Sequence, residues 1–135
     1  MMSQPLIAVA TVLVSMGILD ALWLFTMTTR LYRREMPDLL LPAPSWPPAL
    51  LFYLLYAAGV VVLVVLPALA QQHSLLRAAL TGALLGVVAY GTYDLTNQAT
   101  VRGWSSTVTV VDMVWGGTLT AIVVTIAVLV ARRFS

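Results

Sequence analysis

The sequence predicts an all-α integral membrane protein, a four-helix transmembrane bundle. The chain has 135 residues, of which 61% are hydrophobic and only 9% are charged. A soluble domain would carry about 25% charged residues. The hydrophobic residues form four long blocks separated by polar or proline-rich breaks, and each block is long enough to cross a bilayer. We therefore expect a single transmembrane domain over residues 1–135.

The predicted membrane-spanning helices cover residues 6–29, 48–70, 75–99 and 107–130. The first follows Pro5 and ends at a cluster of arginines that begins at Arg30. The segment 36–48 contains five prolines, which forbid a continuous helix, and Trp46 is a candidate interfacial anchor. We expect this segment to lie on the membrane surface, either as a tether between helices or as a lid over a polar pocket. Short turns join the remaining helices, so consecutive helices are antiparallel.

The charged residues exclude several classes of protein. The net charge of +2 comes from seven arginines, which lie at the helix ends rather than along one face, so nucleic-acid binding has no support. The absence of cysteine excludes disulfides and thiolate metal sites, and a single histidine, His73, excludes multi-histidine centres. The arginines are almost equally divided between the two membrane sides, so the positive-inside rule assigns no orientation.

Three aspartates, Asp20, Asp94 and Asp112, lie inside the predicted membrane-spanning helices. Each would cost roughly 2.5–3.5 kcal/mol at the centre of a bilayer. At 1.5 Å per residue, all three lie about 12–15 Å from the same membrane boundary, the one opposite the chain termini. We call that boundary the aspartate side. His73 is predicted in the turn on the other side, which excludes Ser-His-Asp chemistry with these carboxylates.

Aromatic and polar residues accompany the aspartates at the same depth. Tyr56 occupies this level in the second helix, and Gly82, Gly86, Tyr90 and Asp94 follow a spacing of four residues in the third. The glycine spacing favours close helix packing. The candidate ligand- or proton-binding residues are Asp20, Asp94, Asp112, Tyr56, Tyr90, Tyr93, Asn97, Trp23 and Trp115. A structural network of hydrogen bonds between helices is the alternative interpretation of the same residues.

Four segments carry a resemblance to a known family. They are Leu19–Trp23, Tyr53–Gly59, Tyr90–Asn97 and Val111–Gly116, together with the Arg102-Gly103-Trp104 turn. With these motifs, the chain resembles a bacterial family of small membrane proteins known as domain of unknown function 2177, over nearly its whole length. The resemblance implies a four-helix protein of the bacterial inner (cytoplasmic) membrane, and it implies no activity or substrate.

The favoured function is binding, and proton-coupled transport, of a small cationic or amphipathic ligand. Carboxylates that are close together in a low-dielectric site cannot all ionise, and aromatic rings hold organic cations. The alternatives are a lipid-modifying enzyme that uses the same aspartates, a lipid-binding subunit, or a purely structural network. Whether the protein is an enzyme is left open by the sequence.

The expected partners are membrane lipids, the small ligand and a second copy of the chain in a homodimer. Asp20, Asp94, Asp112 and Asn97 could supply oxygen ligands to a hard cation. However, they come from different helices and show no recognised ligand spacing. We therefore predict no metal and no cofactor.

Overall fold

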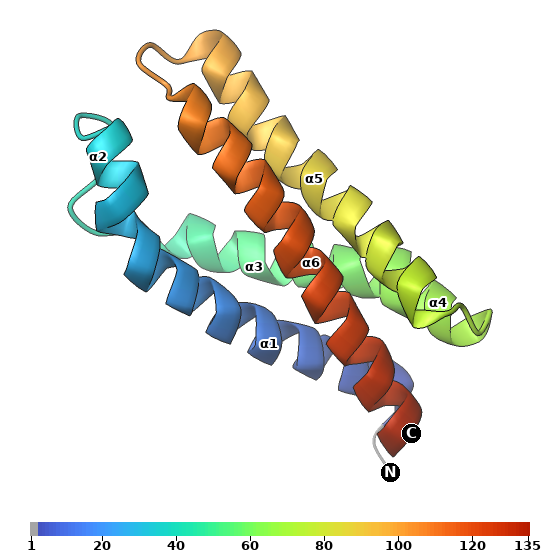
Figure 1. Ribbon diagram of the computed structural model, residues 1–135. Coiled ribbons are helices and arrows are strands. Elements are labelled where there is room, and N and C mark those ends of the chain that lie inside the picture. The colour runs from blue at the N-terminus through green and yellow to red at the C-terminus, as the bar shows by residue number, and fades with distance from the viewer. Residues whose placement is uncertain (1–2) are drawn as a thin grey trace.

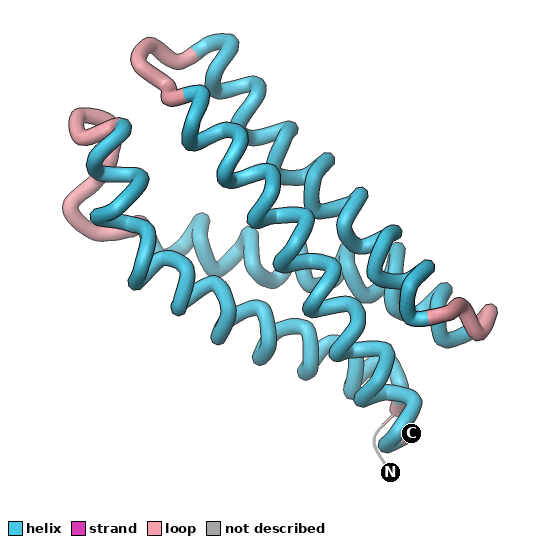
Figure 2. The backbone as a smooth tube through the Cα atoms, in the orientation of Figure 1, coloured by secondary structure: helices cyan, strands magenta, loops and turns pink. Residues whose placement is uncertain are grey.

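The computed structural model describes residues 3–135 and consists of helices that form one elongated bundle (Figure 1). Four of the helical segments are long and apolar enough to cross a membrane: Gln4–Glu35, Trp46–Ala70, Leu75–Thr100 and Ser106–Phe134. No strand occurs among the described residues. Figure 2 shows that the loops lie at the ends of the bundle, as in a protein whose helices span a bilayer. The predicted fold class is confirmed.

The first two spanning segments each contain a short π-helical stretch. The first consists of α1 (Gln4–Met27), η1 (Thr28–Tyr32) and α2 (Arg33–Glu35). The second consists of α3 (Trp46–Val60), η2 (Val61–Val65) and α4 (Leu66–Ala70). A π-helical turn rotates the residues that follow it relative to an α-helix. The first segment therefore continues six residues past its predicted end at residue 29, which brings Tyr32 back to the bundle.

The helices α5 (Leu75–Thr100) and α6 (Ser106–Phe134) run side by side along their length (Figure 1). Glycines make this close packing possible. A Cβ atom at Gly86 would collide with the backbone carbonyl of Gly116, and a Cβ atom at Gly116 would collide with the ring of Tyr90. A Cβ atom at Gly82 would lie 2.9 Å from Val124 Cγ2. The Ser74 and Ser105 hydroxyls cap the two helices by accepting hydrogen bonds from backbone N–H groups.

The half of the bundle nearest the termini contains a dry aliphatic core. Its fully buried members come from every membrane-spanning segment and include Val12, Val60, Val65, Val124 and Val128. The termini meet at this end, where the Gln4 side-chain amide donates to Ser135 Oγ at 2.9 Å. The opposite end is organised differently, because polar and aromatic side chains replace the aliphatic ones there.

At the aspartate side, the chain after α2 is attached to the α5–α6 turn. Ser105 Oγ donates to Glu35 Oε1 at 2.9 Å, and Met36 is buried against Leu31 and Val108. The Arg33 guanidinium donates to the Pro42 carbonyl at 3.3 Å. These contacts fix the proline-rich segment to neighbouring elements.

Candidate functional site

A cavity of about 610 Å³ lies between the helices on the aspartate side. Side chains of α1, η1, α3, α5 and α6 contribute to its wall. The lining residues are Asp20, Trp23, Leu24, Tyr32, Pro48, Ala49, Phe52, Ala89, Tyr90, Tyr93, Asp112 and Trp115. The wall therefore combines two carboxyl groups with six aromatic rings. Of the proline-rich segment, only its last residue, Pro48, belongs to the cavity wall.

Asp20 is held by two aromatic donors from other helices. The indole Nε1–H of Trp115 on α6 donates to Asp20 Oδ1 at 3.3 Å. The hydroxyl of Tyr53 on α3 donates a hydrogen bond to Asp20 Oδ2. Asp20 is half-buried, and both of its oxygens are therefore fixed by neutral donors at the cavity wall.

Asp112 is reached by a chain of hydrogen bonds that starts in α1. The indole Nε1–H of Trp23 donates to the hydroxyl oxygen of Tyr32 at 2.9 Å. The Tyr32 hydroxyl in turn donates a hydrogen bond to Asp112 Oδ1. Asp112 is buried, with 6% of its surface exposed. The π-helical turn η1 is what brings Tyr32 to this position.

The two Asp-x-x-Trp motifs of the sequence are interlocked across the bundle. The indole rings of Trp23 and Trp115 are stacked, with centroids 4.4 Å apart and an interplanar angle of 7°. Each indole N–H serves the aspartate of the other motif, Trp115 directly and Trp23 through Tyr32. Because α1 and α6 are antiparallel, the same three-residue spacing on both helices allows this reciprocal arrangement.

Asp94 lies behind the cavity wall and is completely buried, with 0% of its surface exposed. Its carboxyl group is a neighbour of that of Asp112. Within residues 3–135, neither Asp94 oxygen has a hydrogen-bond donor. The indole of Trp104 also faces Asp94, but its N–H donates to Thr109 Oγ1 at 3.2 Å. A buried carboxyl group without a donor is rare and calls for a physical explanation.

No basic side chain offsets these carboxyl groups in the described part of the chain. The one ion pair there joins Arg34 and Glu35, at 3.9 Å and at the membrane boundary. Apart from one another, the polar neighbours of the aspartates in the described chain are neutral donors. A site of this kind requires a proton or an external cation to balance its charge.

The structure brings most of the predicted site residues together. Asp20, Trp23, Tyr90, Tyr93, Asp112 and Trp115 line the cavity, and Asp94 lies directly behind it. Tyr56 lies beneath it, where its hydroxyl shares a hydrogen bond of 2.7 Å with Thr120 and its ring stacks on Phe52. Asn97 lies outside the cavity and is half-buried. At its level, the apolar cluster of Leu31, Met36 and Val108 closes the bundle.

Three aromatic contributors to the site are not among the predicted ligand- or proton-binding residues: Tyr32 and Phe52, which line the cavity, and Tyr53, which holds Asp20. Tyr32 follows the arginine that was expected to end the first helix. Tyr53 and Phe52 belong to an aromatic run in the second predicted helix that also contains Tyr56. That run was the available signal for Tyr53, since residues 53 and 56 share one helix face.

The rim of the cavity contains side chains that are exposed at membrane-spanning positions. Leu24 on α1, Phe52 on α3 and Tyr93 on α5 are 45%, 46% and 58% exposed. Figure 1 shows that α3 and α5 diverge from the end where α4 meets the start of α5. Because the rim residues lie within the spans, the cavity opens sideways toward the lipid hydrocarbon.

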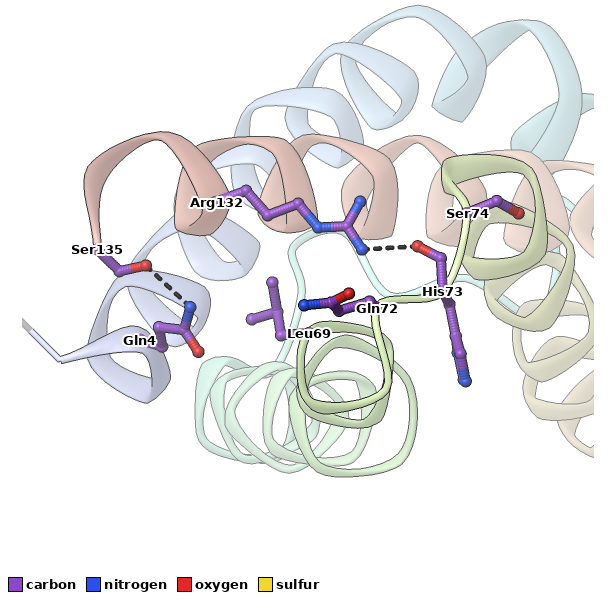
Figure 3. Close-up of a pocket in the computed structure, with 7 residues that line it drawn as sticks. All are labelled: Gln4, Leu69, Gln72, His73, Ser74, Arg132 and Ser135. Carbon is purple, nitrogen blue, oxygen red and sulfur yellow. Dashed lines mark hydrogen bonds between the residues drawn. The ribbon is translucent and has the colours of Figure 1, made fainter.

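A second cavity, of about 590 Å³, lies at the opposite end of the bundle, next to the termini (Figure 3). The Arg132 guanidinium there donates to the His73 carbonyl at 2.6 Å and to the Ala68 carbonyl at 3.4 Å. The positive charge of Arg132 is therefore stabilised by backbone carbonyl groups. The imidazole of His73 points away from Arg132. This end of the molecule is a polar cap with no link to the aspartates.

The carboxyl groups do not form a metal site in the described part of the chain. Within residues 3–135, no group of three histidine, cysteine, aspartate or glutamate side chains is arranged to hold a metal ion. The hard-cation alternative considered from the sequence therefore gains no support from the positions of Asp20, Asp94 and Asp112.

Together, these features define a four-helix integral membrane protein with a cavity lined by carboxyl groups and aromatic rings. A family model described as "Predicted membrane protein (DUF2177)" matches residues 5–129, and the chain belongs to this family. The resemblance noted in the sequence is thereby confirmed. Neither a curated protein nor a solved structure matches the chain.

Proposed function

We propose that the cavity binds a small organic cation or a cationic amphiphile that enters from the membrane. The observation that carries this proposal is the composition of the wall. Two carboxyl groups and six aromatic rings surround a space of about 610 Å³, and no basic residue of the described chain neutralises them. A ligand with positive charge and apolar bulk complements such a wall in both respects.

Asp20 is the carboxylate that would pair with the cation. It is half-buried at the wall, whereas Asp112 and Asp94 are buried. Its two donors, Trp115 and Tyr53, fix its orientation without supplying positive charge. The rings of Trp23, Trp115 and Tyr90 would add cation–π contacts, each worth about 0.5–2 kcal/mol.

Proton-coupled transport of this ligand is the wider form of the proposal. Between the cavity and the opposite end of the bundle, the described residues of a single copy form an aliphatic core without a polar path. Transport would therefore require either a rearrangement of the helices or a path formed between the two chains of a homodimer. We place the protein in the bacterial cytoplasmic membrane, as its family resemblance implies.

The first test measures binding of tetraphenylphosphonium to the purified full-length protein in detergent by equilibrium dialysis. We expect saturable binding to the wild type and at least a tenfold weaker affinity for Asp20→Asn. Asp38→Asn, in the exposed proline-rich segment, is the matched control and should bind as the wild type does. Tetraphenylborate, an anion of similar shape, should not bind. Equal affinity of wild type and Asp20→Asn, or equal binding of the anion, would contradict the proposal.

The lipid-enzyme alternative predicts a different result. The lateral opening favours lipid access, but the lining contains no serine, threonine or cysteine, and its nucleophiles are the tyrosine hydroxyls and the two aspartates. Incubation of the protein with lipid vesicles, followed by mass spectrometry of the lipids, separates the two. If a new lipid product forms with the wild type and is absent with Asp20→Asn, the function is lipid modification rather than ligand binding.

A further inference from the structure

We propose that Asp94 and Asp112 form a proton-binding site, separate from the ligand carboxylate Asp20. The pair holds one proton between its two carboxyl groups while the cavity is empty. The proton leaves when a cation enters next to Asp112. The shared proton is inferred from the geometry of the two carboxyl groups. Its release on cation entry rests on the proposed function.

The geometry of Asp94 is the first argument. Its carboxyl group is fully buried, and no donor of the described residues reaches either oxygen. Its polar side-chain neighbours are the Trp104 indole, whose N–H donates to Thr109, and another carboxyl group, that of Asp112. Two ionised carboxylates in this position would repel each other in a low-dielectric interior. One proton between them turns the repulsion into a hydrogen bond and supplies the donor that Asp94 lacks.

Among residues 3–135, the groups that face the pair contain no positive charge. Asp94 is faced by Asp112 from α6, Tyr32 from η1, Trp104 from the α5–α6 turn, and Tyr93 from its own helix. Asp112 is faced by Tyr32 and Asp94, with Asp20 of α1 and Tyr90 of α5 further away. The tyrosines and the tryptophan are neutral, so a proton is the available counter-charge when the cavity is empty.

The position of the pair connects it to the cavity. Asp112 lines the cavity wall, while Asp94 lies behind it. A cation beside Asp112 would stabilise the ionised form of that carboxyl group. The bound proton then leaves as H⁺ to water on the aspartate side, and the charge of the site is unchanged because one cation replaces another. Asp20 pairs with Trp115 and Tyr53 instead, and has no such carboxyl neighbour.

The test detects the proton directly, by infrared spectroscopy of the full-length protein near neutral pH. Wild type should show the C=O stretching band of a protonated carboxylic acid, with a shift in D₂O. The band should be lost in Asp94→Asn and in Asp112→Asn, and retained in Asp20→Asn. Size-exclusion profiles and circular dichroism would confirm that each variant is folded. Absence of the band in the wild type, or its survival in both Asp94→Asn and Asp112→Asn, would overturn the proton site.

The exchange is tested by adding tetraphenylphosphonium to the same samples in weak buffer. We expect the band to decrease and about one proton to be released per bound cation. Asp94→Asn should bind the cation without proton release. Binding to the wild type with an unchanged band would overturn the exchange alone. Absence of binding would contradict the proposed function, and the infrared assignment would still decide the proton site.

Discussion

Trp23 and Trp115 stack face to face at the centre of the cavity wall, 92 residues apart in the chain, with their ring centroids 4.4 Å apart. Their N–H groups point to opposite partners, toward Tyr32 and Asp20 respectively. This stack joins α1 to α6 at the level of the carboxyl groups. It makes the aromatic wall a rigid element of the site, since each ring is held by both packing and a hydrogen bond.

The stacked pair should report ligand entry through intrinsic fluorescence. We expect tetraphenylphosphonium to change the tryptophan emission of the wild type, because two of the four tryptophans line the cavity. Trp115→Phe should lose most of this change and bind the cation more weakly, since it removes the indole N–H that orients Asp20. Trp46→Phe is the control, because Trp46 is 61% exposed and outside the cavity. An undiminished signal in Trp115→Phe would contradict the assigned ligand position.

The close approach of α5 and α6 predicts a strong effect of a single methyl group. Gly86→Ala should destabilise the protein by about 1–3 kcal/mol, because its Cβ would collide with the Gly116 backbone. Gly17→Ala should be neutral or stabilising by up to about 1 kcal/mol, since no atom lies within 4 Å of its added Cβ and alanine is the better helix former. Thermal denaturation in detergent measures both. Equal melting temperatures for the two variants would show that the glycine contact is not formed.

The hydrogen bond from Tyr53 to Asp20 predicts a difference between two tyrosines. Tyr53→Phe should lower stability by about 1.5–3 kcal/mol, because it removes a donor from a carboxylate in the membrane interior. Tyr93→Phe should change stability little, since its side chain is 58% exposed. Chemical or thermal unfolding of both variants gives the comparison. A larger loss in Tyr93→Phe than in Tyr53→Phe would contradict the proposed arrangement of Asp20.

The topology predicts a pattern of cysteine labelling, which is convenient because the chain has no cysteine. A membrane-impermeant maleimide should label Gln71→Cys and Ser135→Cys from one side of a vesicle, and Arg102→Cys from the other. Val64→Cys should remain unlabelled, because Val64 is 3% exposed within the dry core. Labelling of residues 71 and 102 from the same side would contradict the four-span arrangement.

Helix number and the depth of the aspartates could be predicted from the sequence, since both follow from hydrophobic length and a fixed rise per residue. The Gly82–Gly86 spacing likewise indicated a close contact, and α6 turned out to be the helix that approaches. Periodicity within one helix does not determine which helix faces which. The pairing of Trp115 with Asp20 was therefore beyond the reach of the sequence alone.

Tyr32 was missed for a different physical reason. The sequence Thr-Thr-Arg after the apolar run indicates a membrane boundary, but the helix continues through a π-helical turn to Glu35. No local residue preference predicts such a turn, because it depends on packing around it. Asn97 was predicted to belong to the site but lies outside it. At its level in the bundle, apolar side chains fill the space between the helices.

The sideways opening of the cavity determines which of the two lipid monolayers can supply it with ligands. The opening lies on the aspartate side, while the rest of the bundle is sealed by its aliphatic core. Amphiphiles dissolved in one monolayer can reach the cavity, and those in the other must first flip across the bilayer. The direction in which the chain is inserted would therefore decide which monolayer it samples. With its arginines so evenly divided, a small change in flanking charge could reverse that choice.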